Sequence, residues 1–191
     1  LLTSTARPEN RTRRLHDGLP FQPRCVRTPP SARVEPGRSQ ALRVIFTGAQ
    51  LPADRESVFW LNVLDVPPSP DNADGGEQNY LQVAFRSRLK LFYRPQGLKG
   101  AANDAPESLR WSRTGDRLRV ENPSPFNVTL AEVHAVSGSG EKAVEEKGVM
   151  VAPKQSLEFA APAGTGQVRF ITINDYGGRV EHTIRLGNTG G

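Results

Sequence analysis

The chain has 191 residues and a formal net charge of +5, a length that suits one large domain or two small ones. Sixteen prolines and eighteen glycines, spread between short runs of β-branched and aromatic residues, predict an all-β chain. The composition excludes a transmembrane helix, because no run of about eighteen apolar residues occurs, and the single cysteine, Cys25, excludes an intramolecular disulfide.

The first 27 residues mix Arg, Pro, Thr and Asn without any alternation of apolar and polar side chains. We therefore expect Leu1–Arg27 to be irregular or disordered, we assign it no function, and its start is too poor in apolar residues for a signal peptide. Part of the excess positive charge lies here, on Arg7, Arg11, Arg13 and Arg14. Because no recognition motif or stacking aromatic accompanies the basic residues, nucleic acid is not an expected partner.

The segment after Arg27 is predicted to form short strands separated by turns. From Thr28 the sequence reads TPPSARVEPGRSQALRVIF, in which Pro and Gly supply turns around one short strand and a second strand begins at Ala41. After a turn at Leu51–Asp54, the run SVFWLNVLDV over Ser57–Val66 indicates a buried strand that two prolines stop. The polar loop after it is short enough for a hairpin with the next strand.

That next strand is predicted to be long and to have two different faces. It runs from Asn79 to Pro95, NYLQVAFRSRLKLFYRP. Because successive side chains of a strand point to opposite faces, its odd positions form an apolar row and its even positions a basic one. The apolar row contains Leu81, Val83, Phe85, Leu89, Leu91 and Tyr93, and the basic row contains Arg86, Arg88, Lys90 and Arg94.

A linker and a second domain are predicted after this strand. Residues 96–106 contain two glycines and a proline and are typical of a linker, which divides the chain into domains at 28–95 and 107–191. Two strands follow with a bend at Asn122–Pro125 between them, and GSGEKAVEEKG reads as a solvated loop. Several further short strands up to Arg185 complete the pattern of a small sandwich.

Three motifs resemble those of the periplasmic pilus-assembly chaperones of the chaperone-usher pathway, the PapD-like family. They are DRESVFW at Asp54–Trp60, KLFYRP at Lys90–Pro95 and INDYGG at Ile173–Gly178, in the family's order. The resemblance covers about Thr28 to Arg185. It implies two immunoglobulin-like β-sandwich domains joined at an angle. It also implies a periplasmic chaperone that binds and caps pilus (fimbrial) subunits and delivers them to an outer-membrane usher.

The resemblance implies a subunit-binding site on the long strand. Lys90 would bind the C-terminal carboxylate of a subunit, which suits a compact ammonium group with several donors. Leu81, Val83 and Phe85 would enter the groove of a subunit that lacks a strand, while main-chain hydrogen bonds complete its sheet. Without the resemblance, Lys90 would be read as an ordinary solvated lysine and the three apolar residues as core.

The resemblance further implies an interdomain charged cluster of Glu56, Arg94 and Asp175, in which the arginine forks to both acids. Such a cluster would orient the two domains more than it would stabilise them, since desolvation offsets most of the attraction. Ordinary surface charges are the alternative interpretation.

The family's first domain begins with about three further strands, and the earliest carries an arginine that joins the cleft lysine. No strand pattern precedes Thr28. We therefore expect an incomplete first domain, in which none of the early arginines has this role. The alternatives to a working chaperone are an inactive chaperone fragment and a cell-surface adhesion or structural sandwich protein.

An enzyme is not expected. His16, His134 and His182 are isolated, no Gly-x-Ser-x-Gly motif occurs, and no spacing of His, Cys and carboxylates indicates a metal site. The sequence thus predicts no catalytic residue, no cofactor, no nucleotide and no metal.

Overall fold

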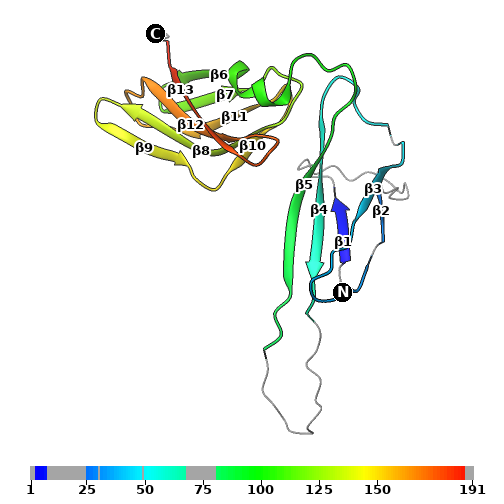
Figure 1. Ribbon diagram of the computed structural model, residues 1–191. Coiled ribbons are helices and arrows are strands. Elements are labelled where there is room, and N and C mark those ends of the chain that lie inside the picture. The colour runs from blue at the N-terminus through cyan, green and yellow to red at the C-terminus, as the bar shows by residue number, and fades with distance from the viewer. Residues whose placement is uncertain (1–2, 8–24, 30, 49, 68–80, 188–191) are drawn as a thin grey trace, which may run out of the picture. The chain divides into compact units, whose positions relative to one another are not determined.

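A computed structural model describes the chain except residues 1–2, 8–24, 30, 49, 68–80 and 188–191 (Figure 1). The described residues form strands and one short 3-10 helix, which confirms the all-β prediction. They fall into two compact units. Unit 1 consists of Leu1–Leu51 and Ser57–Tyr93, and unit 2 of Pro52–Glu56 and Arg94–Gly191.

Unit 1 contains two small antiparallel sheets, a three-stranded one in the order β1-β4-β5 and a two-stranded one of β2 and β3 (Figure 1). The predicted hairpin pairing is confirmed, since β4 and β5 pair without a break from Ser57 opposite Tyr93 to Asp65 opposite Phe85. The Phe46 and Tyr93 rings, 4.4 Å apart between centroids, join β3 to β5. The strands are β1 (Thr3–Arg7), β2 (Cys25–Thr28), β3 (Arg43–Phe46), β4 (Ser57–Asp65) and β5 (Phe85–Tyr93).

Two expectations for unit 1 are wrong. Irregular backbone was expected over Leu1–Arg27, but β1 and most of β2 lie there and pair with β4 and β3. Cross-strand partners override weak local propensity in such segments. The predicted long strand is also shorter, because β5 begins at Phe85 and residues 81–84 are not in a strand. Its partner β4 ends at Asp65, two residues before Pro67, which has no N–H to donate.

Unit 2 is a sandwich of two antiparallel sheets, as predicted. One sheet has the order β10-β8-β12-β13, with β9 also paired to β8, and the other has the order β11-β7-β6 (Figure 1). A 3-10 helix, η1 (Ala102–Ser108), precedes them. The strands are β6 (Arg110–Thr114), β7 (Arg117–Glu121), β8 (Val128–Ser137), β9 (Gly140–Glu145), β10 (Val149–Val151), β11 (Ser156–Ala160), β12 (Gln167–Ile173) and β13 (Arg179–Arg185).

One apolar core fills the space between the two sheets of unit 2. Alternate residues of β7, β8 and β12 are buried, as a half-buried strand requires. The Trp111 ring of β6 lies 5.1 Å from the Phe170 ring of β12, so side chains from both sheets meet. Each large apolar side chain buried in this way contributes about 1.5–3 kcal/mol. The largest fully buried apolar side chains among the described residues are Leu118, Val120, Leu130, Val133, Val151, Val168 and Phe170.

Two segments of unit 2 differ from their predicted form. The segment predicted as a solvated loop contains β9, which pairs with β8 along Gly140–Glu145. Part of the predicted linker is η1, where Ala105 is 3% exposed and packs in the core with Leu109. Both β9 and η1 were missed because Gly and Pro in or near these segments are read as signs of a turn or a loop.

The predicted bend after β7 is held by Asn122, which is fully buried. Its side-chain amide donates to the carbonyls of Phe126 at 2.7 Å and Val151 at 3.1 Å, and its Oδ1 accepts from the Ser124 N–H at 3.0 Å. Because Pro123 and Pro125 have no N–H group, the side chain supplies the donors that the backbone lacks there.

Candidate functional site

The apolar row predicted to bind a subunit is exposed on β5 and on the residues before it. Leu81 is 88% exposed, Val83 45%, and Phe85 67%, and Leu89 further along β5 is 53% exposed. β5 is the last strand in the order of its described sheet, so it is an edge strand (Figure 1). Exposed apolar side chains along an edge are a typical binding surface.

The register of β4 and β5 shows which side chains share a face. Residues directly opposite each other point to the same side of a sheet. On one face Phe59 lies opposite Leu91, and Phe59 is the apolar side chain that unit 1 buries best among those described, at 3% exposure. On the other face, which we call the basic face, Trp60 lies opposite Lys90, Asn62 opposite Arg88, and Leu64 opposite Arg86.

Lys90 is half-buried on the basic face, and an aromatic ring lies beside it. Its Nζ is 5.8 Å from the centroid of the Trp60 ring, while the guanidinium carbon of Arg88 lies 4.0 Å from the same centroid. Both distances are within the range of a cation–π interaction. Sequence reasoning identified Lys90 through its motif but missed Trp60, because nothing in the periodicity shows which residue faces it.

Arg7 lies in the same row of the sheet as Lys90. It is the last residue of β1 and is opposite Trp60, which in turn is opposite Lys90. The expectation that no early arginine joins the lysine depended on the absence of a strand, and that premise is wrong for Arg7. Arg11, Arg13 and Arg14 lie outside the described residues.

The structure brings Glu56, Arg94 and Asp175 together. Arg94 Nε donates to Glu56 Oε1 at 2.7 Å, and its two terminal nitrogens donate to the Asp175 carboxylate at 3.0 and 3.3 Å. The Glu56 side chain is 1% exposed, whereas those of Arg94 and Asp175 are 39% and 38% exposed. Only the glutamate of the predicted cluster is therefore buried.

All three residues of the charged cluster belong to unit 2, although Glu56 precedes β4 and Arg94 follows β5 in the chain. Glu56 Oε2 accepts from the backbone N–H of Asn127 at 2.9 Å and from its side-chain amide at 3.0 Å. Hydrogen bonding to Asp175 and then to Glu56 raises the pKa of Arg94 against the opposing effect of burial. The role of this cluster in orienting the domains stays a prediction.

Two of the histidines lie in contact with other side chains of unit 2. The ring nitrogens of His134 lie 3.3 Å from Glu132 and 2.9 Å from Glu141. Hydrogen bonds from His134 and then from Arg179 lower the pKa of Glu132. His182 is stacked on Phe170, and burial lowers its pKa. In the described part of the chain no group of three or more His, Cys, Asp and Glu is placed to hold a metal.

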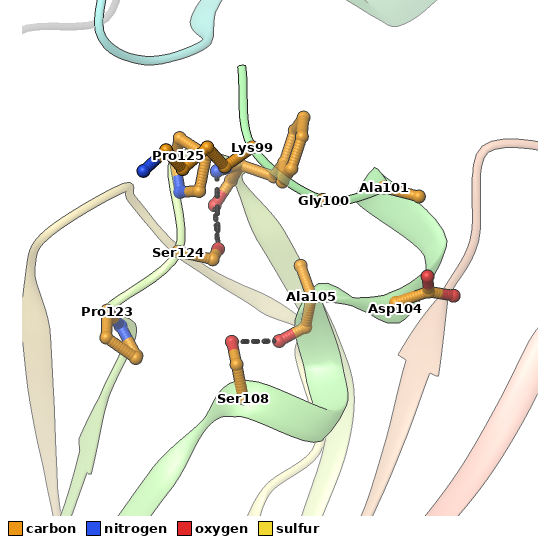
Figure 2. A pocket seen from close by; sticks show the side chains of 10 residues that line it. Lys99, Gly100, Ala101, Asp104, Ala105, Ser108, Pro123, Ser124 and Pro125 are labelled. Atoms are coloured by element: carbon orange, nitrogen blue, oxygen red, sulfur yellow. Dashed lines mark hydrogen bonds between the residues drawn. The ribbon is translucent and has the colours of Figure 1, made fainter.

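A hollow in unit 2 of about 280 Å³ contains none of the predicted site residues. Figure 2 shows it between the segment that leads into η1 and the Pro-Ser-Pro bend, with Pro123, Pro125 and Ala105 among its lining residues. The Ser108 hydroxyl donates to the Ala105 carbonyl at 2.7 Å, so it already serves the turn of η1 (Figure 2). The hollow has the character of a surface depression beside the bend.

Family comparison matches nearly the whole chain. Residues 7–99 match the model of the "Pili and flagellar-assembly chaperone, PapD N-terminal domain", and residues 104–184 match that of the "Pili assembly chaperone PapD, C-terminal domain". The chain belongs to this family of pilus-assembly chaperones. The predicted resemblance is thereby confirmed, and the first match begins well before Thr28.

Known proteins agree with this family assignment. The probable fimbrial chaperone LpfB of Escherichia coli O157:H7 is 43% identical over 157 residues, which cover 81% of this chain and 65% of LpfB. The crystal structure of the YadV chaperone has a TM-score of 0.75 at 33% identity and covers 97% of this chain and 84% of its own. A structure of the Salmonella enterica SafA pilin in complex with the SafB chaperone has a TM-score of 0.74 at 29% identity, with coverage of 97% and 82%.

These matches confirm the fold of two immunoglobulin-like domains.

The chain spans slightly less than two thirds of the length of LpfB. Among the described residues, no helix is long and apolar enough to cross a membrane.

Proposed function

We propose that this chain is a periplasmic chaperone that binds pilus subunits by edge-strand addition and hands them to an outer-membrane usher. The observation that carries the proposal is the exposed apolar row on the edge strand β5 and the residues before it, Leu81, Val83, Phe85 and Leu89. Membership of the pilus-assembly chaperone family supports it, as does the likeness to a structure of a chaperone with a bound pilin. An adhesion protein would not require an apolar row along an edge strand of its described sheet.

In the proposed mechanism, the backbone of β5 pairs with a subunit whose sheet lacks a strand, so that main-chain hydrogen bonds supply much of the affinity. Leu81, Val83 and Phe85 enter the groove of the subunit, where each well-buried side chain adds about 1.5–3 kcal/mol. The subunit's groove is shielded from water and from other subunits until assembly.

Lys90 fixes the register of this pairing by binding the C-terminal carboxylate of the subunit. Its position at the end of the exposed part of β5, half-buried and beside Trp60, supports this role. Arg7 is a second cation candidate, because it occupies the same row across the sheet. The charged cluster of Glu56, Arg94 and Asp175 acts structurally, and the mechanism needs no catalysis, nucleotide or metal.

The test is retrieval of a subunit from the periplasm. The chaperone would be co-expressed with the pilus subunit encoded next to it, and the complex isolated through the chaperone. Lys90→Ala is expected to weaken binding by about 2–5 kcal/mol, because it removes one partner of a charge-assisted pair. The matched control is Lys142→Ala, which removes an exposed lysine of unit 2. Equal recovery of the subunit by parent, Lys90→Ala and Lys142→Ala would contradict the carboxylate anchor, and display of the chain on the cell surface would favour the adhesion protein.

A further inference from the structure

Arg88 lies over an aromatic ring next to the proposed anchor. Its guanidinium carbon lies 4.0 Å above the Trp60 ring centroid, which is the separation of two groups in van der Waals contact. Arg88 itself is exposed, and no carboxylate in the described part of the chain forms an ion pair with it. This cation–π contact restricts the side chain.

The chemistry of a stacked guanidinium explains why this matters. Stacking uses the face of the planar group, whereas its N–H donors lie in the plane and point outward from the edge. These donors match the two oxygens of a carboxylate, to which arginine binds in a bidentate manner. An arginine that is already held over a ring also loses less side-chain entropy on binding than a freely rotating one.

Arg88 and Lys90 lie two residues apart on the same face of β5, and both cations approach one ring. The Lys90 Nζ is 5.8 Å from the Trp60 centroid and the Arg88 carbon 4.0 Å. A single aromatic side chain therefore gathers two positive charges at one place on the sheet. Arg86 is the next residue on this face. Its partner on β4 is Leu64, so the residue directly opposite Arg86 is not aromatic.

We propose that Arg88 is a further ligand for the subunit's C-terminal carboxylate, in addition to Lys90 and the candidate Arg7, and that Trp60 is the positioning residue that holds Arg88 in place. This inference rests on the proposed function, because it concerns the same anchor. It adds a planar, direction-dependent contact to the point charge of Lys90, so that the site recognises the orientation of the carboxylate as well as its charge.

The experiment uses the full chain and two synthetic peptides with the sequence of the adjacent subunit's C-terminal strand, one ending in a free carboxylate and the other in an amide. The ratio of the two affinities measures contact with the carboxylate alone. Arg88→Gln is expected to lower this ratio about tenfold, the effect of one charge-assisted contact. Trp60→Leu should lower it by a similar factor, and the double variant should be no worse than either single one. Arg88→Lys, which keeps the charge but not the plane, should recover only part of the ratio.

Arg86→Gln is the matched control, since it removes a charge from the same face and strand. It should change the ratio by less than about twofold, as expected for an exposed charge. If Arg88→Gln changes the ratio no more than Arg86→Gln while Lys90→Ala abolishes the preference for the acid, the proposed anchor stands and this inference is overturned. If the parent chain binds acid and amide equally, the anchor itself is overturned. Hydrogen exchange of each variant shows whether the sheet stays folded.

Discussion

In unit 2, the strands alternate between buried apolar and exposed polar residues, so that Leu118, Val133 and Phe170 are fully buried. In unit 1, Phe59 is the apolar side chain that the described strands bury to a comparable degree, at 3% exposure. Leu81 and Phe85 of unit 1 are, by contrast, 88% and 67% exposed. The same kind of residue thus serves the interior in one unit and the surface in the other.

This difference shows how one chain combines stability with an apolar binding surface. Unit 2 has its own core and satisfies the ordinary requirement for a stable domain. The exposed row on β5 cannot stabilise unit 1 by itself, since apolar area contributes only when it is removed from water. In the proposed function, the subunit buries that area.

The largest expected effect comes from the same substitution made in both units. Val133→Glu would place a charge in the core of unit 2, where Val133 is 0% exposed, and should destabilise the unit by more than about 5 kcal/mol and so prevent folding. Val83→Glu, at a side chain that is 45% exposed, should leave folding nearly unchanged and should abolish subunit binding. The measurements are region-resolved hydrogen exchange and the retrieval assay. A Val83→Glu chain that unfolds would show that Val83 is a core residue and would break the comparison.

A smaller effect is expected from Glu56→Gln, which tests a buried polar group of unit 2. The amide nitrogen of the new side chain would face donors, since both oxygens of Glu56 accept hydrogen bonds from Arg94 and Asn127. The loss should be about 1–3 kcal/mol of unfolding free energy. Glu158→Gln is the control, because Glu158 is 53% exposed with Arg119 4.0 Å away, and it should cost less than about 0.5 kcal/mol. Equal protection of unit 2 in both variants would contradict a structural role for Glu56.

The smallest expected effect is a pH dependence confined to unit 2. Burial lowers the pKa of His182 below its usual value of 6.5, so that the unfolded chain takes up a proton at a higher pH than the folded one. Unit 2 should therefore lose stability as the pH falls from about 7 towards the folded-state pKa, and the loss should level off below it. In His182→Gln this slope between pH 7 and 5 should be reduced. An identical slope in parent and variant would show that His182 does not titrate differently in the two states. The carboxyls of Glu132 and Glu141, whose pKa values are lowered by their partners, act only at more acidic pH.

The sequence predicted the structure best where a strand could be recognised from its own apolar and polar residues, without knowledge of its partner strand. The alternation over Asn79–Pro95 predicted the two faces of β5, and the run after Arg55 predicted β4 as its partner. β1 and β2 were missed because their conformation depends on pairing with β4 and β3 rather than on their own composition. β9 was missed because Gly-Ser-Gly, which forms its turn, obscured the strand that follows.

The candidate site was predicted from motifs and not from periodicity. Lys90, Glu56, Arg94 and Asp175 were named because they stand in recognisable sequences, and the structure brings the last three within hydrogen-bonding distance. Trp60, although it ends one of the motifs, and Asn127 were not predicted as site residues. Their importance comes from neighbours across the sheet or 71 residues along the chain, which a single sequence does not reveal.

The ion pair between Glu56 and Arg94 also has a consequence for chain entropy. These residues are 38 positions apart, and between them lie β4, the following loop and β5. Joining the ends of such a segment reduces the freedom of the unfolded loop, and this cost rises only logarithmically with its length. Once unit 2 holds Glu56 and Arg94 together, Ser57 and Tyr93 start as neighbours, and each later pair of the β4–β5 ladder forms next to one already made. The loop-closure cost is then met once, when Glu56 and Arg94 come together, and not again for each pair of the ladder.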